Sequence, residues 1–217
     1  MTIHDPDVVL TDLALAALGA WFAWRLRGAR FGELRLSPVV LMAGLAGAAF
    51  WGALFHAFFP ENTTTLPGRL AWIPVTLSIV VAAAMLLEMG LRLLVPRIDD
   101  GIRRGVVGAY AGAFALVVVL VDESFTTIVR FYVPALLLLL VMASIRAARA
   151  GGGWTPIAVG LACSAGAAVL QQMRVALHPA YFDHNAVYHV VQAAALVILY
   201  IGFKRVGRSV VSSPRSS

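Results

Sequence analysis

Histidine and amide side chains gather at the ends of two apolar segments of this 217-residue chain. The stretch "FDHNAVYHVVQ" holds His184, Asn185, His189 and Gln192, and the stretch "WGALFHAFF" holds His56. Histidine is the commonest metal ligand in proteins and also serves as a general acid or base. Polar groups inside an apolar segment are costly and tend to mark sites or cavities. These residues therefore predict a histidine-rich site.

Helical spacing places several of these side chains on one face. At 100° per residue, His189 lies about 40° from Asn185 and about 60° from Gln192, so the three form one polar stripe. His184 lies about 140° from His189 on the same helix. We expect both histidines to bind one metal ion only if the helix begins after His184. The alternative for all of these groups is a helix end that meets interfacial water.

The segments that carry the site are expected to be membrane-spanning helices. The chain is 60% hydrophobic and 13% charged, whereas soluble domains carry about 25% charged residues. It contains no polar–apolar alternation typical of barrel strands, and its apolar segments have about the 20 residues that cross a bilayer as a helix. The fold class predicted is all-α, a polytopic protein with seven transmembrane helices. The segments are 8–26, 37–59, 69–93, 103–121, 124–146, 154–175 and 184–203.

The distribution of cations predicts the orientation of these helices. Fourteen of the seventeen lysine and arginine residues flank the loops on one side, and only Arg69 and Arg174 lie near loops on the other. The positive-inside rule then places the N-terminus outside and the C-terminus in the cytoplasm. The net charge of +6 follows from this topology and does not indicate binding to nucleic acid. The fourteen are Arg25, Arg27, Arg30, Arg35, Arg92, Arg97, Arg103, Arg104, Arg146, Arg149, Lys204, Arg205, Arg208 and Arg215.

Composition also limits the domain organisation, the location and the class of protein that we expect. Residues 1–206 are expected to form one transmembrane domain, and 207–217 a disordered cytoplasmic tail. Arginine far outnumbers the single lysine, which is typical of GC-rich bacterial genomes, so we expect a multi-pass protein of a bacterial inner membrane. The lone Cys163 excludes an intramolecular disulfide. Lys204 lies at the cytoplasmic end of the last segment, which argues against a retinal Schiff base deep in that helix.

With this orientation, polar groups from several segments converge on the outer side. Asp122, Glu123 and Asp183 lie in or beside outer loops, and each is a candidate general base. Other polar residues at the same depth are Asp12, Gln171, Gln172 and Arg174.

The histidine pattern resembles that of the alkaline ceramidase and adiponectin/progestin receptor superfamily. Members of that superfamily carry a histidine at the end of the second helix and an H-x-x-x-H motif at the start of the seventh. The resemblance implies a zinc ion held by three histidines, which activates water for hydrolysis of lipid amides. His56 and His189 match two ligand positions, and His184 would be the third. Asn185 and Gln192 would lie beside these ligands.

The sequence departs from the superfamily pattern at three places. Asn185 stands at the first histidine of the seventh-helix motif, and Gly52 stands where the superfamily has a serine. No aspartate occurs in the third-segment stretch "LAWIPVTLSIV". The stretch "HNAVYHVVQ" also resembles the signature of a group of uncharacterised bacterial membrane proteins. Two hypotheses follow. One is a zinc-dependent, ceramidase-like hydrolase, and the other is a non-enzymatic seven-helix sensor or lipid-binding protein with a degenerate site.

Packing and partners are predicted from small and charged residues. The stretches "AGLAGAAFWGA" and "GAYAGAFA" indicate close approach of helices, either within one chain or in a homo-oligomer. Glu88 and Arg92 have the i,i+4 spacing of a helical ion pair, near the cytoplasmic end of the third segment. Membrane lipids are the partners that this composition implies.

Overall fold

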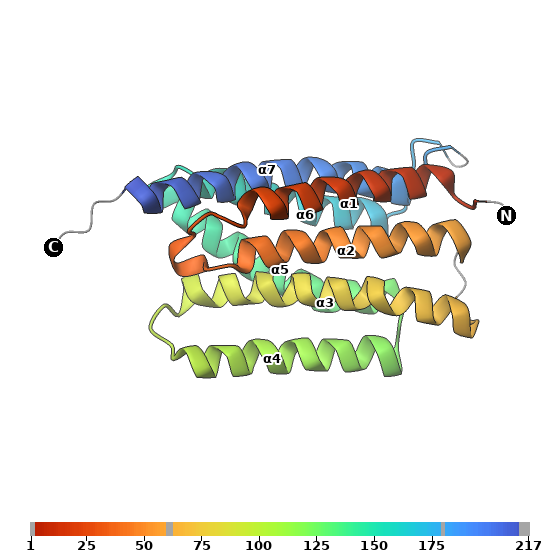
Figure 1. The fold of residues 1–217 in the computed structure, drawn as a ribbon, viewed down its shortest axis with the longest axis horizontal. Coiled ribbons are helices and arrows are strands. Elements are labelled where there is room, and N and C mark those ends of the chain that lie inside the picture. The colour runs from red at the N-terminus through yellow and green to blue at the C-terminus, as the bar shows by residue number, and fades with distance from the viewer. Residues whose placement is uncertain (1–2, 60–62, 179–180, 213–217) are drawn as a thin grey trace.

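A computed structural model describes residues 3–59, 63–178 and 181–212 as a bundle of seven long helices (Figure 1). All seven are long and apolar enough to cross a membrane, and the described residues contain no strand. The predicted all-α, seven-helix class is therefore confirmed. The helices are α1 (Pro6–Leu26), α2 (Ser37–Phe58), α3 (Leu66–Leu94), α4 (Asp100–Leu116), α5 (Phe125–Ala150), α6 (Trp154–Gln172) and α7 (His184–Ser212), with a 3₁₀ turn η1 (Gly32–Leu34) and a π-helical turn η2 (Val117–Val121) that continues α4.

Polar residues at the loop boundaries start several of these helices. The Thr65 hydroxyl accepts a hydrogen bond from the backbone N–H of Gly68 and caps α3. Asp99 caps α4, and the Ser124 hydroxyl caps α5 in the same way. Such side chains satisfy backbone N–H groups that have no partner within the helix. The helix starts therefore lie where the polar loops of the sequence end.

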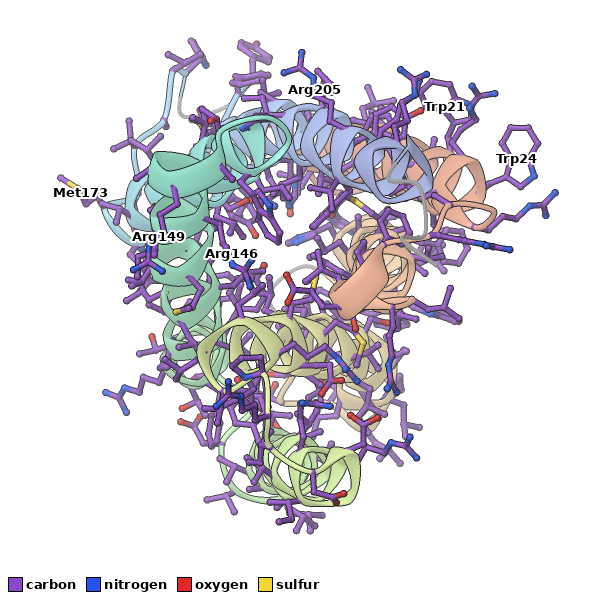
Figure 2. The ribbon with its side chains drawn as sticks, turned by 90° about the vertical axis from the view of Figure 1, so that its left-hand side faces the viewer. Trp21, Trp24, Arg146, Arg149, Met173 and Arg205 are labelled. Atoms are coloured by element: carbon purple, nitrogen blue, oxygen red, sulfur yellow. The ribbon has the colours of Figure 1, made fainter. Side chains whose placement is uncertain are left out.

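Six of the helices form a closed ring, and α4 lies outside it. Each of α1, α2, α3, α5, α6 and α7 packs against the next in that order, and α7 packs against α1. Figure 2 looks along the ring from the end that carries the C-terminus. Helix α4 lies against α3, and its Phe114 ring stacks on Phe131 of α5 with centroids 4.7 Å apart. The fold therefore surrounds an interior space with six helices.

The interior is filled at one end of the ring. We call this the cytoplasmic end and the opposite one the outer end, following the orientation that the arginines predict. Buried side chains such as Phe31, Met89 and Phe203 pack together in the cytoplasmic half. Arg146 of α5 lies 3.2 Å from the carboxylate of Glu33 in η1, which links opposite sides of the ring. The cytoplasmic half of the ring is therefore packed with side chains among the described residues.

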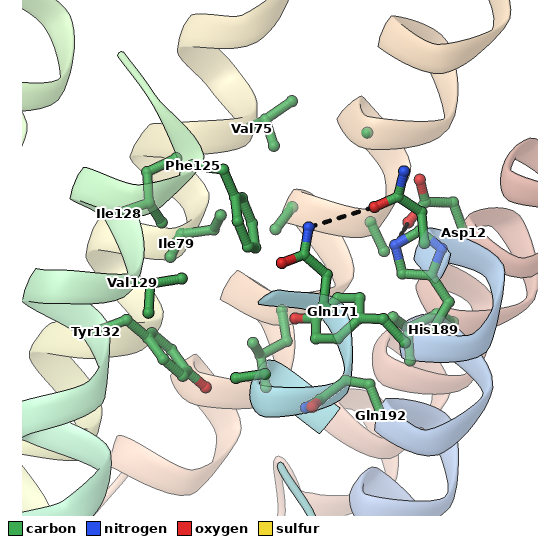
Figure 3. A pocket seen from close by; sticks show the side chains of 18 of the residues that line it. Asp12, Val75, Ile79, Phe125, Ile128, Val129, Tyr132, Gln171, His189 and Gln192 are labelled. Atoms are coloured by element: carbon green, nitrogen blue, oxygen red, sulfur yellow. Dashed lines mark hydrogen bonds and ion pairs between the residues drawn. The ribbon is translucent and has the colours of Figure 1, made fainter. Parts of the chain in front are cut away.

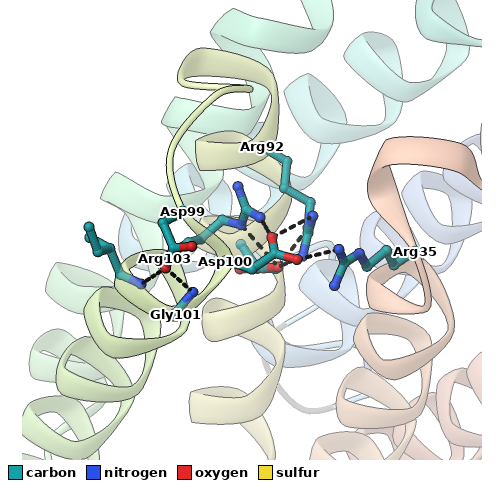
Figure 4. A network of polar contacts seen from close by, with 8 residues as sticks. Arg35, Arg92, Asp99, Asp100, Gly101 and Arg103 are labelled. Carbon is teal, nitrogen blue, oxygen red and sulfur yellow. Dashed lines mark hydrogen bonds and ion pairs between the residues drawn. The ribbon is translucent and has the colours of Figure 1, made fainter.

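A network of charged side chains joins α3, α4 and the connection between α1 and α2 (Figure 4). The predicted pair is confirmed, with Arg92 2.6 Å from the Glu88 carboxylate. Arg103 lies 3.6 Å from the same carboxylate, and Asp100 pairs with Arg35, Arg92 and Arg103. Buried charges need such partners because the desolvation of an unpaired ion is costly. The network therefore fixes the cytoplasmic end of α4 to the ring.

The two stretches of small residues have different surroundings. A Cβ atom at Gly44 would lie 3.1 Å from the Ser78 carbonyl oxygen, and one at Gly47 would lie 3.0 Å from the Ser78 hydroxyl. Close packing within the chain is thus confirmed for α2 against α3. Gly108 and Gly112 of α4 instead face open space. The homo-oligomer stays a prediction.

The last helix extends beyond the expected domain end. Helix α7 continues to Ser212, whereas the transmembrane domain was expected to end at residue 206. The remainder of the expected tail, residues 213–217, lies outside the described residues.

Candidate functional site

The outer half of the ring contains a pocket of about 310 Å³. Side chains from all six ring helices line it, and α4 contributes none among the described residues. Ligand-binding pockets for small molecules begin at about 300 Å³. The pocket is therefore large enough for a small ligand or for one chain of a larger one.

A buried pair of side chains from α1 and α7 forms one side of the pocket (Figure 3). The Nε2 atom of His189 lies 3.2 Å from Oδ1 of Asp12, and its Nδ1 atom lies 3.2 Å from the Thr11 hydroxyl. Asp12 is only 3% exposed. Both ring nitrogens of His189 therefore have partners on α1, which fix the orientation of the imidazole.

The second carboxylate oxygen of Asp12 lacks a hydrogen-bond partner. Among the described residues, two buried side-chain atoms have no hydrogen-bond partner. They are Oδ2 of Asp12 and, at the cytoplasmic end, Nε of Arg103. A Cβ atom at Gly52 would lie 3.0 Å from Oδ2. The glycine therefore lets the carboxylate lie close against α2. A buried acceptor left unpaired costs about 1–3 kcal/mol.

Further polar side chains extend this side of the pocket along α6 and α7. The Gln192 side-chain amide donates to the Ser164 hydroxyl at 3.1 Å, and the Gln171 side-chain amide donates to the side-chain oxygen Oδ1 of Asn185 at 3.4 Å. Figure 3 shows Gln171, His189 and Gln192 on the same side of the cavity. These groups satisfy one another across the α6–α7 interface.

The opposite side of the pocket is apolar. It is made by aliphatic and aromatic side chains of α3 and α5, seen facing the polar side in Figure 3. They include Val75, Ile79, Ile128, Val129 and Tyr132. The pocket thus combines an apolar wall with a hydrogen-bonding wall, which is the arrangement that holds an amphipathic molecule.

The structure brings together all five residues that were predicted as metal ligands or as their neighbours. His56, His184, Asn185, His189 and Gln192 line the same pocket, at the outer ends of α2 and α7. Their shared depth follows from the alternating direction of the helices. These residues therefore lie together around one pocket, and their roles as ligands stay predictions.

The three carboxylates predicted as general bases do not line this pocket. Asp183 accepts hydrogen bonds from the backbone N–H groups of Asn185 and Ala186 and caps α7. Glu123 lies 3.1 Å from Arg69 of α3. The Thr127 hydroxyl and the backbone of Ser124 donate to Asp122, and these bonds hold the pKa of its carboxyl below the ordinary value.

Asp122 and Glu123 line a second, more open hollow at the outer surface. The two cavities share the side chains of Phe55, Trp72 and Phe125. The Trp72 indole donates to the Glu123 carbonyl oxygen at 3.0 Å. These three aromatic rings therefore lie between the surface carboxylates and the main pocket.

The histidines do not fit a three-ligand zinc site in this arrangement. Helix α7 begins at His184 itself, so the condition for His184 and His189 to share one face is not met. A zinc ligand offers an unprotonated ring nitrogen to the metal, and both nitrogens of His189 contact α1. Within the described ranges, no group of three or more histidine, cysteine, aspartate or glutamate side chains is arranged to hold a metal ion.

Sequence reasoning placed Asp12 at the outer side but gave it no role. Thr11, Ser164 and Tyr132 were not singled out at all. Their pairing with α7 and α5 depends on which helices are neighbours in the ring, and helical periodicity within one segment does not contain that information. The only available signal was a carboxylate inside an apolar segment, which is itself unusual.

Comparison with known proteins identifies the family and no activity. Residues 8–208 match the model of DUF6962, a family of unknown function, and the chain belongs to that family. No curated protein and no solved structure matches the chain significantly. The resemblance to the ceramidase superfamily and the zinc ion that it implies therefore stay predictions.

Proposed function

We propose that this member of a family of unknown function binds an amphipathic small molecule or lipid chain in the outer half of its helix ring. One observation carries the proposal. Asp12 is buried beside a cavity with an oxygen that no described group satisfies. Folded proteins rarely leave such atoms unpaired, so a ligand that supplies the missing partner explains the arrangement.

The form of the cavity supports binding better than transport. Its polar wall and its apolar wall face each other across the outer half, and packed core fills the cytoplasmic half. A protein of this form takes up a ligand from the outer side or from the outer leaflet and holds it there. That agrees with a sensor or a lipid-binding protein.

The test compares two tryptophan substitutions on one helix. Val129 of α5 lines the pocket, whereas Val141 of the same helix is 54% exposed on the outside of the bundle. The purified protein is melted with octanol, octylamine or octanoate, because a ligand that binds the folded state raises its melting temperature. We expect at least one amphiphile to stabilise wild type and Val141→Trp but not Val129→Trp. Equal stabilisation of both variants would overturn the proposal.

A zinc-dependent hydrolase of lipid amides is the second candidate. It comes from the resemblance stated above and from the shared pocket of His56, His184 and His189, and it requires these three side chains to leave the arrangement that the structure describes. Protein purified without chelator is analysed for metal, together with the double variant His56→Ala/His189→Ala. About one zinc per chain that the double variant loses would establish the zinc site that this candidate needs, and metal-free wild type would remove the candidate.

A further inference from the structure

We infer that the ligand of this pocket carries an amine head group that pairs with Asp12, an inference that rests on the proposed function. The inference begins with the hydrogen bonds of the polar wall. Gln192 already donates to Ser164, and Gln171 already donates to Asn185. Asn185 in turn donates to a carboxylate oxygen of Asp183 at 3.4 Å. On the same wall, Oδ2 of Asp12 is a buried acceptor that no described group satisfies, so a ligand that brings a donor completes it.

Oδ2 of Asp12 reaches the cavity through a change in the orientation of the carboxyl group. His189 contacts Oδ1, and Oδ2 lies against α2 at Gly52, in space that a side chain there would need. The torsion between Cβ and the carboxyl group of an aspartate is broad and soft. A small rotation about it therefore turns Oδ2 toward the cavity that the same residue lines.

Charge selects an amine over other donors. The residues that line the pocket include one carboxylate, Asp12, and one guanidinium, Arg174, which is exposed at the outer end of α6. Hydrogen bonds between charged groups are roughly twice as strong as those between neutral ones. A protonated amine forms such a hydrogen bond with the Asp12 carboxylate. A hydroxyl supplies one neutral bond, and a carboxylate head is repelled.

The remainder of the ligand is apolar. Val75, Ile79 and Val129 form the wall that faces Asp12 and His189 (Figure 3). An alkyl or aromatic chain attached to the amine buries its apolar surface there. The ligand class is thus an amphipathic amine with its nitrogen at the α1–α7 side of the pocket and its chain toward α3 and α5.

The experiment measures apparent dissociation constants of four octyl compounds from concentration-dependent melting of the purified full-length protein. The compounds are octylamine, octanol, octanoate and N-octylacetamide, which keeps an N–H donor but has no charge. We expect wild type to bind octylamine at least about tenfold more tightly than any of the other three, a ratio that corresponds to about 1.4 kcal/mol. This comparison uses wild-type protein alone, so it does not depend on whether a variant folds.

Two carboxamide variants locate the preference. Asp12→Asn should weaken octylamine binding about tenfold or more and change octanol binding less than about twofold. Asp5→Asn is the matched control, because Asp5 is exposed at the start of the same helix, and it should keep the wild-type ranking. Octanol or octanoate binding as tightly as octylamine, or equal loss of all compounds in Asp12→Asn, would overturn the amine assignment while leaving an amphiphile pocket in place. No stabilisation by any of the four would overturn the proposed function itself.

Discussion

At the scale of single residues, the site depends on one carboxylate and one imidazole held between two helices that are far apart in sequence. His189 contacts Asp12 through one ring nitrogen and Thr11 through the other. Removing the ring leaves the buried Asp12 carboxylate without this partner, whereas the Thr11 hydroxyl keeps its hydrogen bonds to the backbone carbonyls of Asp7 and Val8. The effect of that loss separates a built site from a helix end exposed to water.

His189→Ala is expected to lower the free energy of unfolding by about 2 kcal/mol, because it leaves Asp12 with two unsatisfied oxygens. Thermal or denaturant unfolding in one detergent measures the change. His4→Ala is the control, since His4 is exposed near the start of α1, and it should change the free energy by less than about 0.5 kcal/mol. Similar effects of the two substitutions would mean that water replaces the His189 ring at little cost.

Gly52 offers a second test of the same carboxylate. Gly52→Ala places a methyl group 3.0 Å from Oδ2 of Asp12 and should lower the melting temperature, because the methyl group needs space that Oδ2 occupies. Gly52→Ser brings a hydroxyl that can donate to Oδ2, so it should melt above the alanine variant and bind octylamine more weakly than wild type. A serine variant that melts at or below the alanine variant would show that Oδ2 needs no donor.

At the scale of helices, glycines set the distance between ring neighbours most tightly at α6 and α7. A Cβ atom at Gly160 of α6 would lie 2.7 Å from Cγ and 3.0 Å from the backbone nitrogen of Leu199. Gly166 of the same helix faces open space. This interface also carries Ser164 and Gln192, so its spacing determines one side of the pocket.

Gly160→Ala should therefore destabilise the protein clearly, by about 1–3 kcal/mol as is typical of overpacking. Gly166→Ala should be neutral or slightly stabilising, because alanine is favoured over glycine in a helix by about 1 kcal/mol. Unfolding of the two variants under identical conditions makes the comparison. A harmless Gly160→Ala would show that α6 and α7 can separate without cost.

The helices themselves could be predicted from sequence, because each apolar segment contains the length signal that membrane crossing requires. The shared depth of His56, His184 and His189 in the membrane could also be predicted, because successive segments cross it in alternating directions. The partner of His189 did not follow, because α1 and α7 become neighbours only when the ring closes. The apolar wall of Val75, Ile79 and Val129 was also beyond prediction, since an aliphatic residue in such a segment fits lipid, core and pocket equally well.

At the scale of the whole molecule, the orientation in the membrane decides which compartment the pocket faces. Reporter fusions after Pro60, Asp122 and His178 are expected to report the outer side. Fusions after Arg30, Asp99 and Gly152 are expected to report the cytoplasm, because the fourteen flanking cations favour that side. The reverse pattern would place the pocket in the inner leaflet and direct the search for its ligand to the cytoplasm.

The position of α4 outside the ring has a consequence for the order in which the chain crosses the membrane. Helices α3 and α5 are neighbours in the ring, and both run from the outer end toward the cytoplasmic end. The end of α3 and the start of α5 lie on opposite sides of the membrane, so a short turn cannot join them. The chain must cross the membrane once more between the two helices. Helix α4 is that crossing, and it runs from the cytoplasmic end to the outer end. It separates the three helices α1–α3 from the three helices α5–α7, and the two sets cross the membrane in the same order of directions. Helix α4 therefore has to keep the length that spans the membrane and the charges that fix it to the ring.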